Sequence, residues 1–361
     1  MNKRIHIYLF FAVLLLVTFG IIMIYSSSYI WAEYKFNDAY KYVKQQSLFA
    51  IIGTILMIIV SKIDYKIYYK KAWPIFICSI ILLILVLIPG IGSVRNGSRS
   101  WFGIGSFGIQ PSEAAKLSLI ILTSKYLTNS NKFIKDIKKG VLPILGVLFL
   151  VFALIMLEPD FGTGIVIVMT IIVLLFVSGV KMNFFIKLGV LGLLGVVVLV
   201  IIAPYRMERI ISFINPWSDP LGSGFQIIQS LYAIGPGGLL GLGFGNSVQK
   251  HFYLPEPQTD FIFSIISEEF GFLGVIIVAT LFITIIYSGF KIAMNCEDKF
   301  GKYLAFGITF GLAFQTMLNL MVVVGLIPVT GVTLPFLSYG GSSLLISLIN
   351  MGILLNIDKN S

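Results

Sequence analysis

Carboxylates next to apolar sequence are the residues best able to do chemistry in this chain. Asp260 ends the segment PEPQTD and directly precedes an apolar run that holds Glu268 and Glu269. In a helix, Glu268 would share a face with Asp260, and Glu269 would be turned about 100° away. A carboxylate at an apolar boundary can serve as a general base toward a sugar hydroxyl. Asp260 alone could be a helix cap worth about 1 kcal/mol, but the two further carboxylates favour an active role.

A second candidate is an acid and a base in one helix. Pro111 is well suited to start a helix, and Glu113 then lies three residues before Lys116 on one face. A lone charge in lipid costs at least about 2.5 kcal/mol, so this pair must face protein or water. The pair either locks two helices together or forms the polar wall of a substrate cavity. We favour the wall, with Arg95 and Arg99 above it to bind phosphate.

Two shorter segments also carry groups that could bind a substrate. Glu158 and Asp160 flank a proline in what must be a tight turn, although Asp160 or Thr163 could equally cap the next helix. The run from Gly331 to Ser343 contains Ser338 and Ser342. Its glycines and proline let the backbone break at a membrane edge, which leaves N–H groups and hydroxyls for an anionic ligand. Small residues also serve close helix packing.

The composition fixes the class of protein that must position these residues. Of 361 residues, 57% are hydrophobic and 12% are charged, and the mean hydropathy is +0.96. These values exclude an ordinary water-soluble domain and predict an all-α polytopic membrane protein. Two cysteines and two histidines are too few for a disulfide framework or for a metal site built from those residues.

Apolar stretches of membrane-spanning length predict about ten helices in a single membrane domain over residues 1–361. The predicted spans are 6–31, 45–62, 73–90, 111–128, 140–157, 161–180, 183–203, 261–290, 303–326 and 336–357. A long external loop, about 204–260, separates the seventh span from the eighth. It carries Lys250 and Glu256, and its aromatic and glycine-rich composition argues against disorder.

Loop charges predict the orientation. Most of the 26 Lys and Arg residues fall on the side that holds the N-terminus, and most of the 16 carboxylates fall toward the other side. By the positive-inside rule both termini are cytoplasmic in the cell membrane. The net charge of +10 is thereby explained as topology, so nucleic acid is not an expected partner.

Five ordered motifs together resemble the SEDS family (shape, elongation, division and sporulation), whose branches are FtsW, RodA and stage V sporulation protein E. The motifs are NGSRSWFGIGSFGIQPSEAAKL, EPDFGTG, NPWSDPLGSGFQIIQSLYAIGPGGLLGLG, YLPEPQTDFIFSIISEEFGF and GLIPVTGVTLPFLSYGGSS. They extend over nearly the whole chain, and the sporulation and FtsW branches are the most similar. The sequence does not separate a division role from a sporulation role.

The resemblance implies a ten-span peptidoglycan glycosyltransferase that polymerises lipid II on the outer face of the membrane. It implies that Asp260 is the catalytic base, that Trp101, Glu113 and Lys116 matter for activity, and that the partner is a class B penicillin-binding protein transpeptidase. The expected substrate-binding residues are Arg95, Arg99, Trp101, Glu113, Lys116, Glu158, Asp160, Lys250, Glu256, Ser338 and Ser342.

Other functions stay open at this point. No cofactor is certain; a divalent cation, Mg²⁺ or Mn²⁺, could help to stabilise a diphosphate leaving group, but the sequence has no dedicated ligand set. A lipid II flippase or other transporter would also need a polar cavity, and it would need that cavity near the middle of the membrane. A noncatalytic scaffold for the transpeptidase is the third reading.

Overall fold

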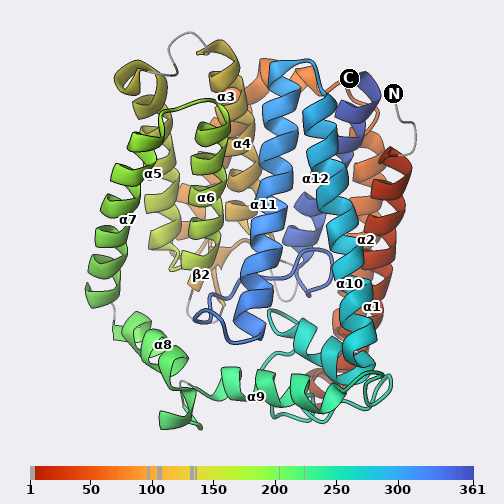
Figure 1. Ribbon diagram of the computed structural model, residues 1–361. Coiled ribbons are helices and arrows are strands. Elements are labelled where there is room, and N and C mark those ends of the chain that lie inside the picture. The colour runs from red at the N-terminus through yellow and green to blue at the C-terminus, as the bar shows by residue number, and fades with distance from the viewer. Residues whose placement is uncertain are drawn as a thin grey trace.

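The computed structural model describes residues 5–95, 98–103, 108–130, 134, 136–202, 204–222 and 224–361. Long helices form a bundle, and both ends of the chain lie at one end of it (Figure 1). The long helices are α1 Ile5–Phe36, α2 Lys41–Val60, α3 Lys66–Leu87, α4 Pro111–Asn129, α5 Leu142–Leu157, α6 Phe161–Val177, α7 Met182–Ile202, α10 Ile262–Asn295, α11 Lys299–Val323 and α12 Gly341–Asn360.

Short elements lie at the opposite end of the bundle, where α8, α9 and β2 are labelled in Figure 1. Strands β1 and β2 form an antiparallel hairpin in which Val94 pairs with Arg99. The bounds are β1 Ser93–Arg95, β2 Ser98–Trp101, α8 Pro204–Ile214 and α9 Phe225–Ile234, with 3₁₀ turns at Pro216–Ser218 and Gly235–Gly237 and one π-helical turn, Ile137–Val141, before α5.

Eight of the described helices are long and apolar enough to cross a membrane, which confirms the predicted all-α polytopic class. The other two predicted spans are present as helices α4 and α6. Helix α6 is apolar but has only 17 residues, and α4 contains Glu113, Lys116 and Lys125. Charges inside α4 require protein neighbours, and 14 of its residues are buried.

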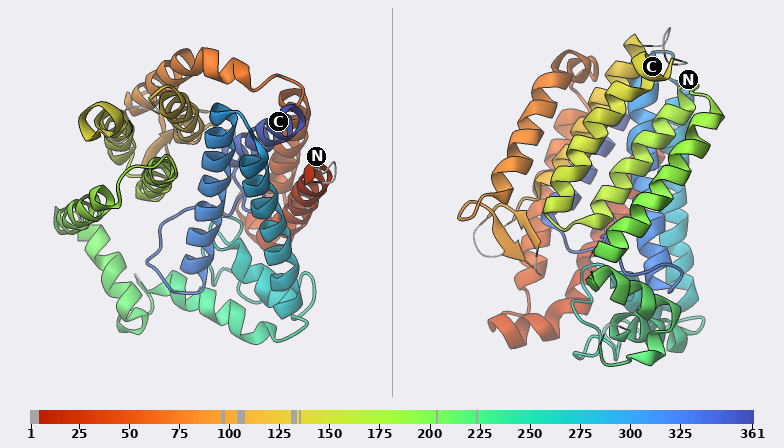
Figure 2. Two further views of the ribbon diagram at one scale, coloured as in Figure 1. Left: turned by 45° about the horizontal axis from the view of Figure 1, so that its top comes forward. Right: turned by 90° about the vertical axis from the view of Figure 1, so that its left-hand side faces the viewer.

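One large cluster of buried apolar side chains extends through the bundle from α1 to α12. Helix α7 is the exception, because no residue of its apolar window is buried. Figures 1 and 2 show α7 at the edge of the bundle, continuing into α8. Most of its described apolar side chains are exposed and suit a lipid environment, whereas Phe184 and Phe185 pack against the bundle, Phe185 on Phe176 of α6.

The structure corrects several predicted boundaries. Helix α3 begins at Lys66 rather than at residue 73, so Lys66, Lys70 and Lys71 belong to the helix and not to the loop before it. Lysine can bury its aliphatic stem and keep its ammonium group in water, which explains why these charges do not end the helix. The hairpin and the two helices inside the predicted loop 204–260 were not expected from the sequence.

Helix α10 breaks at Gly271, whose φ is +60°. The glycine-rich segment before it packs against this break: Leu242 N–H donates to the Glu268 carbonyl oxygen at 2.9 Å, and Phe272 N–H donates to the Gly238 carbonyl oxygen at 2.9 Å. These bonds satisfy backbone groups that the interrupted helix leaves open. A Cβ atom at Gly271 would lie 2.4 Å from Gly241 N, so only glycine fits.

We predict that Gly271→Ala lowers the free energy of unfolding by at least about 2 kcal/mol, because it combines a left-handed φ with a backbone clash. Gly146→Ala is the matched control. Gly146 lies inside α5 with nothing near its missing Cβ, so alanine there should leave stability unchanged or raise it. Thermal unfolding of both variants in detergent measures the difference. Equal melting temperatures for the two variants would contradict the proposed role of the break.

Candidate functional site

Asp260 lies just before α10, where this part of the chain meets α11 and the segment before α12. It is half-buried, and Thr259 Oγ1 donates to its carboxylate at 2.9 Å. The side chain of Asn319 on α11 donates to the carbonyl oxygens of Asp260 and Val332, each at 2.7 Å. Asp260 does not cap the helix, because α10 begins at Ile262 and has no side-chain cap. Its carboxylate is therefore held in place without serving the helix end.

A cavity of about 1530 Å³ opens beside Asp260 at the end of the bundle away from the termini. Its walls come from α1, α2, α4, α6, α11, strand β2 and the segments before α10 and α12. Helices α7, α8, α9 and α12 also contribute residues, such as Val200, Ile210 and Gln226. The structure brings several predicted site residues together in this wall: Trp101, Glu113, Lys116, Asp160, Glu256 and Asp260. Its size suits a ligand larger than a drug-like molecule.

Glu113 and Lys116 serve both roles that the sequence left open. Lys116 Nζ donates to Glu113 at 2.8 Å and to Gln315 Oε1 on α11 at 2.7 Å. The pair is buried, and both residues line the cavity. The same ammonium group thus locks α4 to α11 and forms part of the polar wall. Because a carboxylate already accepts from it, little of its charge is left for an anionic ligand.

Asp160 caps α6, as one reading of the sequence expected, and it also ties α6 to α4. One carboxylate oxygen accepts from Thr163 N–H at 3.0 Å, and the other accepts from Gln110 Nε2 at 2.9 Å. Burial raises the pKa of Asp160, and the hydrogen bonds from Thr163 oppose that rise. Asp160 lines the cavity, so capping and ligand contact are compatible in this residue.

Glu158 precedes that turn and is fully buried, and neither of its carboxylate oxygens has a hydrogen-bond partner. Burial, together with the nearby charge of Asp160, raises the pKa of Glu158 to about 9. Its backbone carbonyl accepts from Ser98 Oγ, which attaches the hairpin to the turn. Glu158 is not part of the cavity lining, so the structure keeps it behind the wall as a neutral acid near pH 7.

Lys250, Glu268 and Glu269 form a separate buried network. Lys250 Nζ lies 3.0 Å from Glu269, and Ser26 Oγ on α1 donates to Glu269 at 2.6 Å. Ser247 Oγ donates to Glu268 at 2.5 Å. These bonds fasten the segment between α9 and α10 to α1 and α10. Although Lys250 borders the cavity, its side chain is 0% exposed, so this ammonium group is committed to the fold.

Ser338 and Ser342 are occupied by backbone groups, contrary to the expectation that their hydroxyls are free. Ser338 Oγ accepts from Leu334 N–H at 2.8 Å. Ser342 Oγ accepts from Gln110 N–H at 3.0 Å and donates to the Gly108 carbonyl oxygen at 2.9 Å. Both residues are buried and outside the cavity lining. Ser342 therefore uses its hydroxyl hydrogen within the fold, whereas the bond of Ser338 uses its hydroxyl as an acceptor.

The basic residues expected above Glu113 are placed differently. The hairpin puts Trp101 in the cavity wall, whereas Arg99 is not among the lining residues and its buried Nε has no partner. The side chains of Arg95 and Arg206 lie outside the described residues. The predicted phosphate-binding role of Arg99 therefore stays a prediction without support from its position.

Several cavity residues were missed at the sequence level. Gln315 lines the cavity and lies four residues before Asn319 in an apolar span, a spacing that signals a polar helix face. Lys35 and Lys41 also line the cavity, but in the sequence they read as ordinary loop charges. Gln258 is buried beside Asp260 and has an unpartnered Oε1 that faces no protein donor.

No group of three or more His, Cys, Asp or Glu residues within the described ranges could hold a metal ion. The carboxylates of the cavity wall are spread over α4, α6 and the segment before α10. The expected Mg²⁺ or Mn²⁺ therefore has no protein ligand set here, and it stays an untested prediction. We derive no step of the chemistry through a cation.

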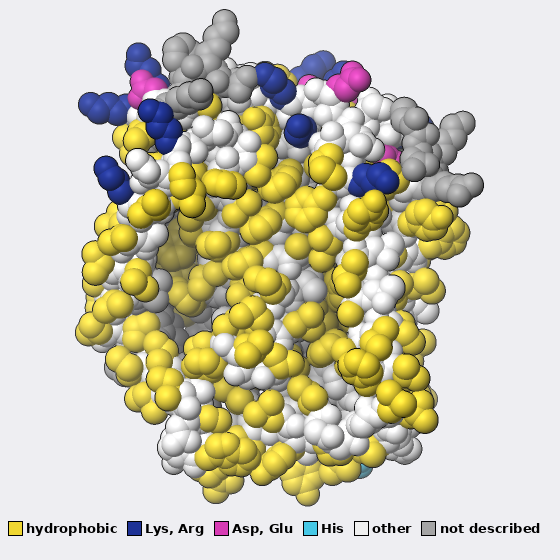
Figure 3. Space-filling view, in the orientation of Figure 1, with side chains coloured by type: hydrophobic (Ala, Val, Ile, Leu, Met, Phe, Trp, Pro, Cys, Tyr) yellow, Lys and Arg dark blue, Asp and Glu magenta, His cyan; other side chains and the backbone are white. Residues whose placement is uncertain are grey.

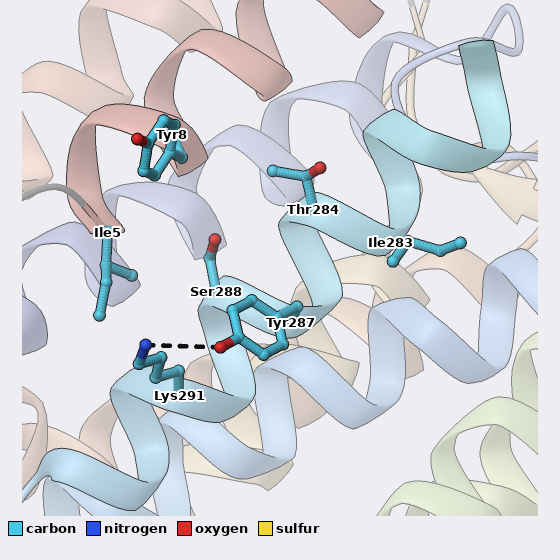
Figure 4. Close-up of a pocket in the computed structure, with 7 residues that line it drawn as sticks. All are labelled: Ile5, Tyr8, Ile283, Thr284, Tyr287, Ser288 and Lys291. Carbon is cyan, nitrogen blue, oxygen red and sulfur yellow. Dashed lines mark hydrogen bonds between the residues drawn. The ribbon is translucent and has the colours of Figure 1, made fainter.

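A smaller hollow of about 400 Å³ lies between the start of α1 and the far end of α10 (Figure 4). Its polar groups include Lys291, whose Nζ contacts the Tyr287 hydroxyl at 3.4 Å, together with Thr284 and Ser288. Asp260 precedes the first turn of α10 and Lys291 is near its last turn, so the two pockets are separated by most of a 34-residue helix. This hollow contains no acid that could act as a base.

Known proteins identify the chain. The family described as "Cell cycle protein", which comprises FtsW, RodA and SpoVE, matches residues 6–361. Stage V sporulation protein E of Bacillus subtilis (strain 168) is 53% identical over 348 residues, which cover 96% of this chain and 95% of that protein. The chain belongs to the FtsW/RodA/SpoVE family. The resemblance read from the five motifs is thereby confirmed.

Further relatives support this family membership. The probable peptidoglycan glycosyltransferase FtsW of Geobacter sp. (strain M18) is 42% identical over 343 residues, covering 95% of this FtsW/RodA/SpoVE protein and 94% of the relative. A chain from a peptidoglycan synthase complex, solved to study the coordination of polymerization and crosslinking, is 32% identical with a TM-score of 0.80 and covers 98% of this chain and 97% of that one. RodA of Thermus thermophilus is 28% identical with a TM-score of 0.72, covering 98% and 96%.

We predict that Lys116→Met destabilises this FtsW/RodA/SpoVE protein by about 3–5 kcal/mol, because Glu113 is then left buried without its counterion. The double variant Glu113→Gln/Lys116→Met should recover most of that loss. Thermal unfolding of the two single variants and the double variant in detergent tests the coupling. If the stability loss of the double variant equals the sum of the losses of the two single variants, the ion pair does not stabilise the contact between α4 and α11.

A second prediction concerns the pH dependence of stability. The folded chain binds the Glu158 proton more tightly than the unfolded chain does, so this contribution is complete below a pH of about 4.5 and is lost as pH rises toward about 9. Glu158→Gln should therefore gain stability relative to wild type as pH rises across this range. Melting temperatures measured against pH test it, with the exposed Glu33→Gln as control. A difference in melting temperature between Glu158→Gln and wild type that does not change with pH would refute the prediction.

Proposed function

We propose that this protein is a peptidoglycan glycosyltransferase that polymerises lipid II into β-1,4-linked glycan strands. The observation that carries the proposal is Asp260, a positioned carboxylate in the wall of a large polar cavity at one end of a membrane bundle. The names of the FtsW relatives, probable peptidoglycan glycosyltransferases, support the same activity.

The proposal includes an orientation in which the cavity opens on the outer face of the cell membrane. Lys and Arg side chains gather at the end that carries both termini, while the rest of the visible face is largely apolar (Figure 3). The positive-inside rule makes that end cytoplasmic. The external segments that frame the cavity, including α8 and α9, then lie where lipid-linked precursors are used for wall synthesis.

The proposed reaction uses one general base, Asp260, and two lipid-linked sugars, an acceptor and a donor. Asp260 takes the proton from the 4-hydroxyl of the N-acetylglucosamine of the acceptor, and that oxygen attacks the anomeric carbon of the growing chain. The new C–O bond forms as the bond to the diphosphate breaks, and undecaprenyl diphosphate leaves with the electron pair. Attack from the opposite face inverts an α-linked donor to a β-1,4 bond. The Thr259 hydroxyl lies 2.9 Å from the Asp260 carboxylate and 2.7 Å from the Glu256 carbonyl oxygen, so its one hydrogen can reach either acceptor beside the base.

The alternative functions explain less of the geometry. An alternating-access carrier needs its site near the middle of the membrane, where both sides can reach it, whereas Asp260 lies at the end of a spanning helix. A scaffold role is compatible with catalysis.

We propose that a class B penicillin-binding protein is the partner, as the similarity to a chain of a synthase complex suggests. The exposed apolar side chains Phe272, Leu273, Ile276 and Ile277 on α10 offer a surface for its membrane helix.

We predict that Asp260→Asn abolishes polymerisation, with a rate loss of about 100-fold or more, because removing a general base costs that much. The assay uses purified lipid II and purified protein with its transpeptidase partner inactivated. Glu33→Gln, an exposed acid at the same end of the bundle, is the control and should retain the wild-type rate. Equal product from wild type and a well-folded Asp260→Asn would refute the base assignment. No product from an intact wild-type complex would favour the carrier or the scaffold.

A further inference from the structure

The two lysines predicted to bind substrate, Lys116 and Lys250, line the cavity, but both are already ion-paired. Four lysines border the cavity within the described chain: Lys35, Lys41, Lys116 and Lys250. Lys116 is ion-paired with Glu113 at 2.8 Å, and Lys250 with Glu269 at 3.0 Å. Both pairs are buried, so neither ammonium group offers an uncompensated charge to an anionic ligand.

Lys35 and Lys41 differ from these two because neither has a carboxylate partner. All 16 acidic residues lie in the described ranges, and no ion pair among them includes Lys35 or Lys41. Asp38, the acid between them in sequence, is held instead by Lys44 at 3.0 Å. Among the described residues of the cavity wall, the uncompensated positive charge is therefore concentrated beside the turn between α1 and α2.

The two ammonium groups gather around one aromatic ring. Lys41 Nζ lies 3.0 Å from the centre of the Phe36 ring, and Lys35 Nζ lies 5.6 Å from the same centre and 5.4 Å from the Trp31 ring. Aromatic faces stabilise single cations but do not cancel the repulsion between two of them. An anion with several oxygens, such as a diphosphate, can accept from both groups at once.

Contacts connect this turn to the segment that carries Asp260. Tyr42 follows Lys41, and its ring centre is 4.9 Å from that of Tyr339. Tyr339 N–H donates to the Gln258 carbonyl oxygen at 2.8 Å, two residues before Asp260. The lysine pair and Asp260 thus belong to one wall, and their segments are connected through the ring contact of Tyr42 with Tyr339 and the backbone of Tyr339.

We propose that Lys35 and Lys41 bind the diphosphate of the acceptor lipid, as a subsite distinct from that of the leaving group. This inference rests on the proposed function, because polymerisation brings two lipid-linked diphosphates into one cavity. The leaving diphosphate is bonded to the carbon under attack and must lie beside the hydroxyl that Asp260 deprotonates. The acceptor diphosphate is separated from that hydroxyl by the length of its disaccharide. A cationic pair that lines the same cavity as Asp260 but lies on a different segment fits the acceptor.

The experiment measures initial rates of polymerisation against lipid II concentration for Lys35→Gln/Lys41→Gln in membranes of zwitterionic phospholipid. We expect KM to rise about tenfold or more, because charge-assisted contacts to phosphate are lost, while kcat changes little. Lys35→Arg/Lys41→Arg keeps the charge and should stay near wild type. Lys44→Gln is the matched control, because Lys44 is in the same turn, is 66% exposed and does not line the cavity. Melting temperatures verify that each variant folds.

Several results would overturn the inference. An unchanged KM in the glutamine double variant excludes a binding role, and a loss confined to kcat assigns the pair to the leaving group instead. A defect that occurs only in membranes with anionic phospholipid means that the lysines bind lipid headgroups, not substrate.

A binding measurement distinguishes failure of this inference from failure of the proposed function. Lipid II is added to intact wild-type and double-variant proteins that both carry Asp260→Asn, and the bound lipid is quantified by native mass spectrometry. Weaker binding by the double variant supports the subsite even if wild type makes no glycan, whereas equal binding refutes it. Absence of glycan from wild type, by contrast, refutes only the polymerase.

Discussion

Pairing of the carboxylates buried inside helices is the constraint on which the rest of this structure depends; Glu158, in the turn before α6, is buried without a partner. Glu113, Glu268 and Glu269 lie inside helices that otherwise bury apolar side chains. Each of them is held by a lysine, a serine or a backbone N–H group from another segment. Removing one partner would leave a charge in a medium that cannot solvate it. The acids therefore fix how segments distant in sequence meet, and the cavity lies where those segments meet.

This constraint also divides the charged residues into two groups. Lys116 and Lys250 neutralise acids of the fold, so their charges are used before any substrate arrives. Asp260 belongs to the other group: its carboxylate does not cap α10, and Asn319 fixes its backbone carbonyl oxygen. Fixing the backbone of a residue whose side chain lines the cavity is a way to hold a reactive group in position.

The sequence was sufficient to predict the polytopic fold, because apolar length and charge at the loops are local signals. It also located Asp260, Glu113 and Asp160 in one functional region through the family motifs. It did not reveal that Ser338 and Ser342 are consumed by backbone groups, since those partners come from residues more than 200 positions away or from the same turn. Nor did it separate Lys35 and Lys41 from ordinary loop charges, because their lack of a carboxylate partner is a property of three-dimensional packing.

Helix α7 has a consequence for how the cavity accommodates a growing polymer. It contributes Val200 to the cavity wall, yet none of its apolar window is buried against the bundle. Near its start α7 is attached to the bundle by Phe184 and Phe185, which pack against the core. Toward Val200 a sideways displacement exchanges mainly lipid contacts for lipid contacts, so its free-energy cost is small. The contact between α4 and α11, by contrast, is held by the buried pair of Lys116 and Glu113. The wall beside Val200 is therefore the part that can shift at the lowest cost.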